Sequence, residues 1–360
     1  MKIGILTFQF AHNYGALLQA YALQSYLKNK GFEVEVLNFI PTQVKREYSM
    51  NPFEYSKSPK VIISLIIRNI YRRKQNHLFK AFQRDFLKLG KPIFTTEELN
   101  HAESRFDYIS VGSDQVWNVS LTGNIKDYYL DFASKTTRKM SYAGSFGTNH
   151  VNDYQIDQIK ECFPYYVAIS VREEMAKDII EECTGLKPQV VCDPVFLLSR
   201  DMWSGFGRKP KSIKSHKKYV LYYSLRYDSD LVAKAEEYAR IHDSLLYVIH
   251  PTAVRQKIDG MQLYDVGPRQ FIWLIENAVC VVTNSFHAVA FSTIFRKRII
   301  HRSANGLGSR VTSLFHQLKM EYNEKDGAMD LSKIDDLNMN RLQQSGTDYL
   351  ESVFVQGELE

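Results

Sequence analysis

The residues in this chain best suited to chemistry are Ser285 and His287. They follow a short, apolar, β-branched run, Val279–Val282, which is typical of a strand buried on both faces. Ser285 is a cap-type residue, and the apolar segment Ala288–Phe295 predicts a helix immediately afterwards. Ligands of open α/β sheets bind at such strand-to-helix junctions, and a helix amino terminus favours anions. His287 is therefore a candidate titratable group in an anion site, although the position suits a structural histidine equally well.

Two other predicted strand ends carry polar residues. Ser113 and Asp114 follow the predicted strand Tyr108–Val111, where they are either site residues or caps of the next helix. Arg172 follows the predicted strand Tyr166–Val171 and begins a helix, where its charge opposes the helix dipole. Arg172 is therefore either solvated or bound to an anion.

The elements that must position these residues begin with a strand–helix–strand pattern. Lys2–Thr7 predicts a buried strand, Ala16–Lys30 a helix and Glu33–Leu37 a second strand. This order indicates a parallel sheet with a right-handed crossover. The first loop contains only one glycine, Gly15, so the glycine-rich fingerprint of a dinucleotide site is absent.

A length of 360 residues predicts two domains. The stretch 195–216 is loop-like and basic, and we expect it to connect them. The prediction is an N-terminal α/β domain over 1–194, a C-terminal α/β domain over 195–334, and a closing helix and tail over 335–360. Two α/β halves that face a cleft indicate two Rossmann-like domains in a glycosyltransferase-B-like fold.

The amino-acid composition further narrows the class of protein. With 44% hydrophobic and 24% charged residues, the chain is typical of a folded globular protein. Its four cysteines show no CxxC pair and no metal-ligand spacing, so we expect reduced thiols and no metal site. No signal peptide and no apolar run of membrane-spanning length is evident, which favours a cytoplasmic protein.

The charge of the chain is concentrated in residues 57–91. This segment carries ten Lys or Arg residues against one acid, Asp85, interleaved with apolar residues. The pattern predicts one or two basic amphipathic helices. Their basic face is either simply solvated or in contact with anionic lipid or a polyanionic acceptor. No nucleic-acid recognition motif accompanies the charge, so we expect no nucleic-acid partner.

Six segments in order resemble the polysaccharide pyruvyltransferase family, whose members form pyruvate ketals. They span His12 to Arg310 and read HNYGALLQAYALQ, VGSDQVWN, SYAGSFG, SVREE, VCDPVFLL and GPRQFIWLIENAVCVVTNSFHAVAFSTIF, the last followed by Ser309-Arg310. The chain departs from the family at Ala288, where Gly is frequent, and at Asn284, where Asp is common. Neither change removes a group that the chemistry needs.

The resemblance implies transfer of pyruvate from phosphoenolpyruvate to two hydroxyls of one sugar, giving a cyclic ketal and phosphate. By similarity, His287 is the catalytic histidine and Arg172 a donor-binding arginine, while Arg310 stands where the family places another basic donor ligand. Phosphoenolpyruvate carries a phosphate and a carboxylate, which arginines and helix-end amides can bind. The implied reaction needs no cofactor or metal besides this co-substrate.

Further roles follow from position beside these residues. Ser285 is a candidate donor ligand, and Asp114 is a candidate catalytic base or, alternatively, a structural cap. The candidate acceptor-binding residues are His12, Asn13, Ser113, Gln115, Trp117 and Asn118. The implied acceptor is a sugar of a cell-surface polysaccharide or of a precursor linked to undecaprenyl diphosphate. Residues 57–91 would then contact the inner face of the membrane peripherally.

Two rival interpretations predict different products. A nucleotide-sugar-dependent glycosyltransferase of the same architecture would release a nucleoside diphosphate. A non-catalytic sugar-binding subunit would release no phosphate and would tolerate loss of His287.

Overall fold

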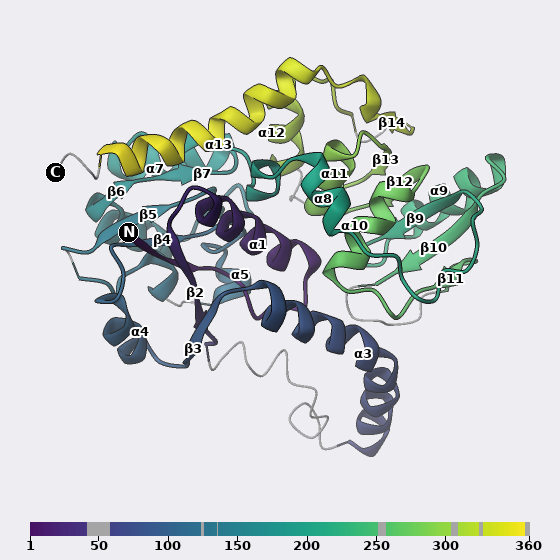
Figure 1. Cartoon of the computed structure of the whole chain (residues 1–360), viewed down its shortest axis with the longest axis horizontal. Helices are drawn as coiled ribbons and strands as arrows, with labels where there is room; N and C mark the ends of the chain where they lie inside the picture. Colours follow the sequence, from purple (N-terminus) through teal and green to yellow (C-terminus); the bar gives the residue numbers. More distant parts are fainter. Residues whose placement is uncertain are drawn as a thin grey trace.

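The computed structural model describes residues 1–41, 58–123, 126–134, 136–250, 257–303, 309–323 and 327–356. Its first half forms a six-stranded parallel sheet with the order β3-β2-β1-β4-β5-β6 (Figure 1). The strands are β1 (Lys2–Leu6), β2 (Glu33–Phe39), β3 (Leu89–Ile93), β4 (Tyr108–Val111), β5 (Arg138–Ser141) and β6 (Tyr166–Ala168). A separate two-stranded sheet pairs β7 (Ser170–Val171) with β8 (Gln189–Val190).

The second half repeats the same strand order. Its six-stranded sheet runs β11-β10-β9-β12-β13-β14, parallel except for the antiparallel pair β13–β14. The strands are β9 (Tyr219–Tyr223), β10 (Leu245–Ile249), β11 (Met261–Gln262), β12 (Cys280–Thr283), β13 (Arg298–His301) and β14 (Met329–Asp330). In each sheet the order reverses beside the first strand, and ligands of doubly wound folds bind at that point.

Helices connect these strands. Those of the first half are α1 (Tyr14–Asn29), α3 (Pro59–Phe86), α4 (Thr96–Glu103), α5 (Val119–Thr122), α6 (Asp153–Cys162) and α7 (Glu174–Thr184). The later ones are α8 (Arg200–Phe206), α9 (Ser229–Ile241), α10 (Pro268–Asn277), α11 (Phe286–Ile294), α12 (Ser309–Gln317) and α13 (Asp336–Gln356). Short 3₁₀ turns are η2 (Lys126–Tyr129), η3 (Phe163–Tyr165), η4 (Pro194–Leu197) and η5 (Leu331–Lys333).

The central strands form because their residues are apolar or β-branched and are covered on both faces. Every residue of β9 and of β12 is buried. A parallel sheet with helices on both sides requires such continuous apolar strands. The run Val279–Val282 thus forms β12 where the sequence predicts a strand, and α11 follows it.

The two halves share one apolar core through α1, α10 and α11. Tyr14 of α1 stacks on Phe271 of α10 with ring centroids 4.6 Å apart. Its hydroxyl donates to the carbonyl of Val266 at 3.1 Å. Trp203 of α8 packs edge-on against Phe291 of α11. The stretch 195–216, expected to be a loop, therefore contains η4 and α8 and contributes to this core.

The closing helix, α13, returns to the first half of the molecule along the upper edge of Figure 1. The hydroxyl of Tyr349 donates to the carbonyl of Ser141, and the amide of Cys192 donates to Ser345 Oγ. The last helix of the chain thus stabilises the first sheet.

Lys57 lies outside the described residues, and the rest of the basic segment forms a single helix, α3, followed by the edge strand β3. In the described ranges, every helix is too short or too polar to span a bilayer.

Candidate functional site

His287 occupies the first turn of α11, directly beyond the carboxyl end of β12. Ser285 caps this helix, since its Oγ accepts from the amide of Ala288 at 3.5 Å, and its own amide donates to Thr283 Oγ1. The residue is only 6% exposed. The predicted strand-to-helix junction therefore places His287 where the two halves of the chain meet.

The imidazole of His287 lies against the first turn of α1. A Cβ atom at Gly15 would come within 2.0 Å of His287 Nδ1, so only glycine leaves room for the ring. Asn13 caps α1 by accepting from the amides of Gly15 and Ala16 at 2.9 and 3.3 Å. The sequence HNYG thus supplies the helix cap, Asn13, and a glycine, Gly15, that leaves room for the ring of His287 from the other half.

Asp193, which follows β8, links His287 to Arg172. Its Oδ2 accepts from Arg172 Nη1 at 2.7 Å and lies 3.5 Å from His287 Nε2. Ser113 Oγ is 3.4 Å from the same oxygen. Burial by itself would raise the pKa of Asp193, but the neighbouring His287 and Arg172 hold that pKa well below its usual range. Asp193 is therefore an anion at neutral pH, between two basic side chains.

Arg172 lies at the centre of this arrangement. Its Nη2 is 3.8 Å from Asp114 Oδ1, and its Nε is 3.9 Å from Glu173 Oε2. The guanidinium carbon lies 4.7 Å from the ring centroid of Phe286, within the range of a cation–π contact. Burial disfavours the charge, but the neighbouring carboxylates, Asp193 first among them, outweigh it and raise the pKa of Arg172.

Arg310, in the first turn of α12, approaches the same aromatic ring. Its guanidinium carbon lies 5.7 Å from the ring centroid of Phe286. With the amide of Gln115 oriented toward it, the amide oxygen accepts from Nη1 and Nη2 of Arg310 at 2.9 and 3.1 Å. Burial, and next the charge of Arg172, lower the pKa of Arg310 to about 10, so it stays charged at neutral pH.

We refer to Arg172, His287 and Arg310 as the cationic cluster. Several of its polar atoms are buried without a hydrogen-bond partner among the described residues: Nε and Nη2 of Arg172, Nε of Arg310 and Nε2 of His287. Buried donors without acceptors are costly in a folded protein. Guanidinium groups pair best with the planar oxygens of carboxylates and phosphates, so the cluster is suited to an anion.

A buried acid borders the cationic cluster. Glu173 Oε1 accepts from Ser145 Oγ at 2.6 Å, while its Oε2 has no hydrogen-bond partner among the described residues. Burial raises the pKa of Glu173, although Arg172 opposes this shift. Glu173 is thus a buried acid that holds its proton more tightly than a solvent-exposed glutamate does.

The loop after β4 brings three of the candidate residues to the cluster. Ser113 is buried and donates to the carbonyl of Ala143 at 3.0 Å. Asp114 Oδ1 accepts from the amide of Gln115 at 2.8 Å, and Asp114 has a left-handed backbone with φ of 80°. Asp114 therefore combines a turn-forming role with a place beside Arg172.

Three other candidates lie outside the cluster. The His12 ring stacks on Phe79 of α3, and burial, followed by the charge of Arg72, lowers the pKa of His12 to about 4. Trp117 is fully buried, and its Nε1 donates to the carbonyl of Tyr128, so its side chain belongs to the core instead of lining a cleft. Asn118 caps α5 and donates to Gln115 Oε1 when that amide faces it.

Sequence reasoning missed Asp193, Glu173, Ser145 and Phe286 as site residues. The signal for Asp193 is its position shortly after strand β8, the same kind of strand-end position that singles out Ser113 and Asp114. The contact with His287 joins residues far apart in the chain, which periodicity does not reveal.

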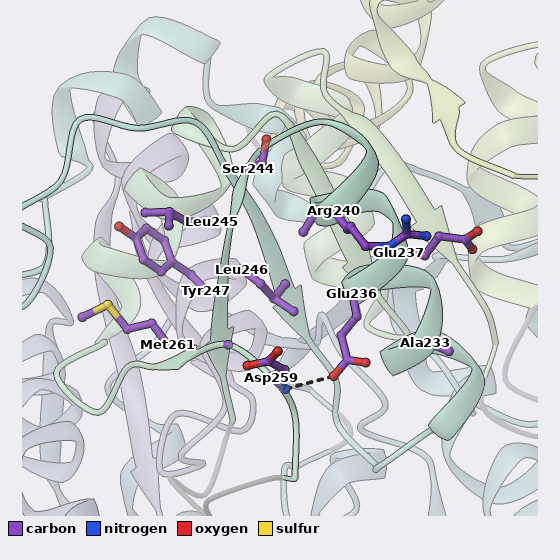
Figure 2. A pocket seen from close by; sticks show the side chains of 12 residues that line it. Ala233, Glu236, Glu237, Arg240, Ser244, Leu245, Leu246, Tyr247, Asp259 and Met261 are labelled. Carbon is purple, nitrogen blue, oxygen red and sulfur yellow. Dashed lines mark hydrogen bonds between the residues drawn. The ribbon is translucent and has the colours of Figure 1, made fainter.

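An open pocket of about 920 Å³ lies elsewhere, between α9, strand β10 and the edge strand β11 (Figure 2). Its lining includes Glu236, Glu237 and Arg240 of α9, and Glu236 accepts from the amide of Asp259. Ser244 and Leu245 place it at the amino end of β10, whereas His287 follows the carboxyl end of β12. None of the candidate site residues lines this pocket.

The family described as polysaccharide pyruvyl transferase matches residues 13–303, which is most of the chain. The chain belongs to this family. The expected family is thus confirmed, and with it a transferase that acts on polysaccharide. The matched range contains Arg172, Asp193 and His287, while Arg310 lies just beyond it.

Solved structures support the fold. UDP-GlcNAc 2-epimerase from Neisseria meningitidis is 11% identical with a TM-score of 0.51, and the match covers 98% of this chain and 100% of that one. The epimerase from Methanocaldococcus jannaschii is 10% identical with a TM-score of 0.50, covering 99% and 100%. At this identity the likeness concerns the fold alone, and the glycosyltransferase-B-like arrangement is confirmed. No curated protein matches the sequence.

The contact between Gly15 and His287 makes a prediction for the transferase. Gly15→Ala should displace the imidazole of His287. With the role that the resemblance implies for this histidine, we expect the turnover of pyruvyl transfer to fall about a hundredfold, because small misplacements of reacting groups are that costly. The matched control is Gly205→Ala in α8, where a Cβ atom meets nothing within 4 Å. Steady-state kinetics of both variants would measure the effect. Unchanged turnover in Gly15→Ala would contradict the role of this contact.

Proposed function

We propose that this transferase moves pyruvate from phosphoenolpyruvate to two hydroxyls of one sugar, forming a cyclic ketal and releasing phosphate. The observation that carries the proposal is the cationic cluster, in which two buried guanidinium groups with unpartnered N–H donors lie beside a buried histidine. Membership of the family supplies the class of reaction.

The negative charge of phosphoenolpyruvate is complementary to the positive charge of the cationic cluster. Phosphoenolpyruvate has two anionic groups, a carboxylate and a phosphate. In our proposal Arg172 and Arg310, on the same Phe286 ring, bind these groups together with the amino end of α11, which begins at the cap Ser285. Charge neutralisation by arginines and helix amides provides for the phosphate, and we propose no metal or further cofactor.

Two bonds to the central carbon of the donor must form. One sugar hydroxyl oxygen adds to that carbon while the methylene carbon takes up a proton and becomes a methyl group. The second hydroxyl oxygen then bonds to the same carbon, and the bond between this carbon and the bridging oxygen of the phosphate breaks. The proton of the second hydroxyl leaves with the phosphate. We propose that His287 provides the proton to the methylene carbon or assists phosphate departure.

The neighbours of His287 fit this role. Asp193 Oδ2 lies 3.5 Å from His287 Nε2, so this carboxylate can orient the imidazole. Asp114, in the adjacent loop, is our candidate for accepting a proton from an attacking hydroxyl. Ser113 and Gln115 are in the same loop, on the side where the acceptor would bind.

The buried state of the cluster has a consequence for binding. Arg172, His287 and Arg310 are 3%, 6% and 7% exposed, and they come from both halves of the chain. In our proposal the two halves separate to admit the substrates, and closure excludes water from the reaction.

For the acceptor, we propose a sugar of a cell-surface polysaccharide or of its precursor, including one linked to undecaprenyl diphosphate. In this proposal the reaction takes place in the cytoplasm at the inner face of the membrane. The family supports a polysaccharide acceptor in general terms.

Donor binding tests this assignment directly. Arg310→Gln should weaken phosphoenolpyruvate binding about tenfold to a hundredfold, the loss expected for one or two charge-assisted hydrogen bonds. Isothermal titration calorimetry of the wild type and the variant would measure it, with the exposed Arg240→Gln as the matched control. Equal affinity in Arg310→Gln and the wild type would remove Arg310 from the donor site.

A further inference from the structure

The outer face of α3 forms one continuous stripe of exposed residues. They succeed one another at alternating steps of three and four, which keeps them on one side of a helix: Ile63, Ile66, Ile70, Arg73, His77, Lys80 and Arg84. The first three are 57%, 43% and 66% exposed. The stripe is therefore apolar in the first turns of the helix and cationic in the rest.

The opposite face holds the helix rigidly on the protein. Phe79 packs against Tyr14 of α1, and Phe82 against Tyr21. Gln75 donates to the Tyr14 hydroxyl and to the carbonyl of His250. These contacts lie in the second half of α3, and in Figure 1 its first turns project away from both sheets. The three isoleucines are thus presented on a projecting part of an anchored helix.

The charged residues around the three isoleucines favour one kind of binding partner. Lys60, Arg73 and Lys74 are exposed and form no ion pair with a described residue. Asp85 is the single acid of α3; it lies near the other end of the helix and pairs with Arg84. Exposed isoleucines flanked by cations that pair with no described residue suit an interface that is apolar inside and anionic outside.

We propose that α3 docks the transferase on an anionic phospholipid surface, with Ile63, Ile66 and Ile70 inserted among the lipids. A second copy of the chain fits less well, because antiparallel pairing of two stripes about Ile66 would bring Arg73 and Lys74 of one copy near Lys60 of the other. The proposal extends the proposed function, since a lipid-linked acceptor would be presented at such a surface.

The anchored half of α3 connects this surface with the turn that holds His287. Phe79 stacks on His12, whose neighbour in the chain, Asn13, caps the turn that seats His287 through Gly15. Docking through α3 would therefore bring the acceptor side of the site toward the lipid.

The test is co-sedimentation of the full chain with phosphatidylcholine vesicles that do or do not contain phosphatidylglycerol. We expect binding to the vesicles with phosphatidylglycerol, weakened by salt, and little binding to phosphatidylcholine alone. The variant Ile63→Ser/Ile66→Ser/Ile70→Ser should lose at least about tenfold in vesicle affinity. Arg73→Gln/Lys74→Gln should bind less and depend less on salt.

The matched control removes equally exposed apolar side chains elsewhere, in Ile241→Ser/Leu337→Ser, which should bind as the wild type does. Wild-type protein that stays in solution, or a triple serine variant that binds equally well, would overturn the proposal. So would a dimer in analytical ultracentrifugation that the triple variant dissociates. Transfer to a soluble acceptor should be unchanged in every variant, so failure of docking is distinguished from failure of the proposed reaction.

Discussion

Replacement of His287 by glutamine is expected to lower the turnover of pyruvyl transfer by about a hundredfold to ten-thousandfold, the usual contribution of a general acid or base. Glutamine retains a polar side chain of similar reach but does not transfer a proton at neutral pH. The affinity for phosphoenolpyruvate should change only a few-fold, because Arg172 and Arg310, which we propose bind this donor, remain in place. Kinetics at saturating donor would separate these two effects.

The exposed His150→Gln serves as the control for this variant and should leave turnover unchanged. Full turnover in His287→Gln would show that the histidine seated on Gly15 has a structural role only. Loss of donor affinity with unchanged turnover would instead make His287 a binding residue.

Replacement of Asp193 by asparagine is expected to reduce both activity and stability. The change leaves the guanidinium of Arg172 buried without its closest counterion, whose Oδ2 lies 2.7 Å from Nη1. Breaking a buried pair from one side costs about 3–5 kcal/mol. Denaturant unfolding at neutral pH would measure the loss, with the exposed Asp348→Asn as the control.

The pH dependence of stability distinguishes the charge of Asp193 from its shape. Because its pKa is depressed in the folded protein, the carboxylate stabilises the fold above the unfolded pKa of about 3.9. This contribution begins to decrease as the pH falls below about 4 and is lost only as the pH passes through the depressed pKa of the folded protein. The difference between wild type and Asp193→Asn should therefore shrink in acid, and a constant difference would contradict an electrostatic origin.

The sequence predicts the central elements of each half because their signals are local. An apolar, β-branched run followed by a cap-type serine predicts β12 and α11, and with them the position of His287. The edge strand β3 was not predicted, since its sequence LGKPI contains Gly and Pro. Both are tolerated there because β3 has a neighbour on one side only.

The internal arrangement of the site depends on contacts that no local pattern encodes. The motif GSDQVWN predicts a polar loop at a strand end, yet its Asp114 lies beside Arg172 while its Trp117 enters the core. The same holds for Asp193, whose strand, β8, has only two residues and whose partners come from other elements. Residue type and strand-end position identify candidates, and tertiary packing decides among them.

The measurement that bears most directly on the proposed reaction is phosphate release from phosphoenolpyruvate with a panel of sugar acceptors, followed by mass spectrometry of the acceptor. The proposal predicts release that depends on the acceptor, together with an acceptor heavier by one pyruvic acid less one water. Absence of phosphoenolpyruvate turnover and binding, with release of a nucleoside diphosphate from a nucleotide sugar instead, would contradict it.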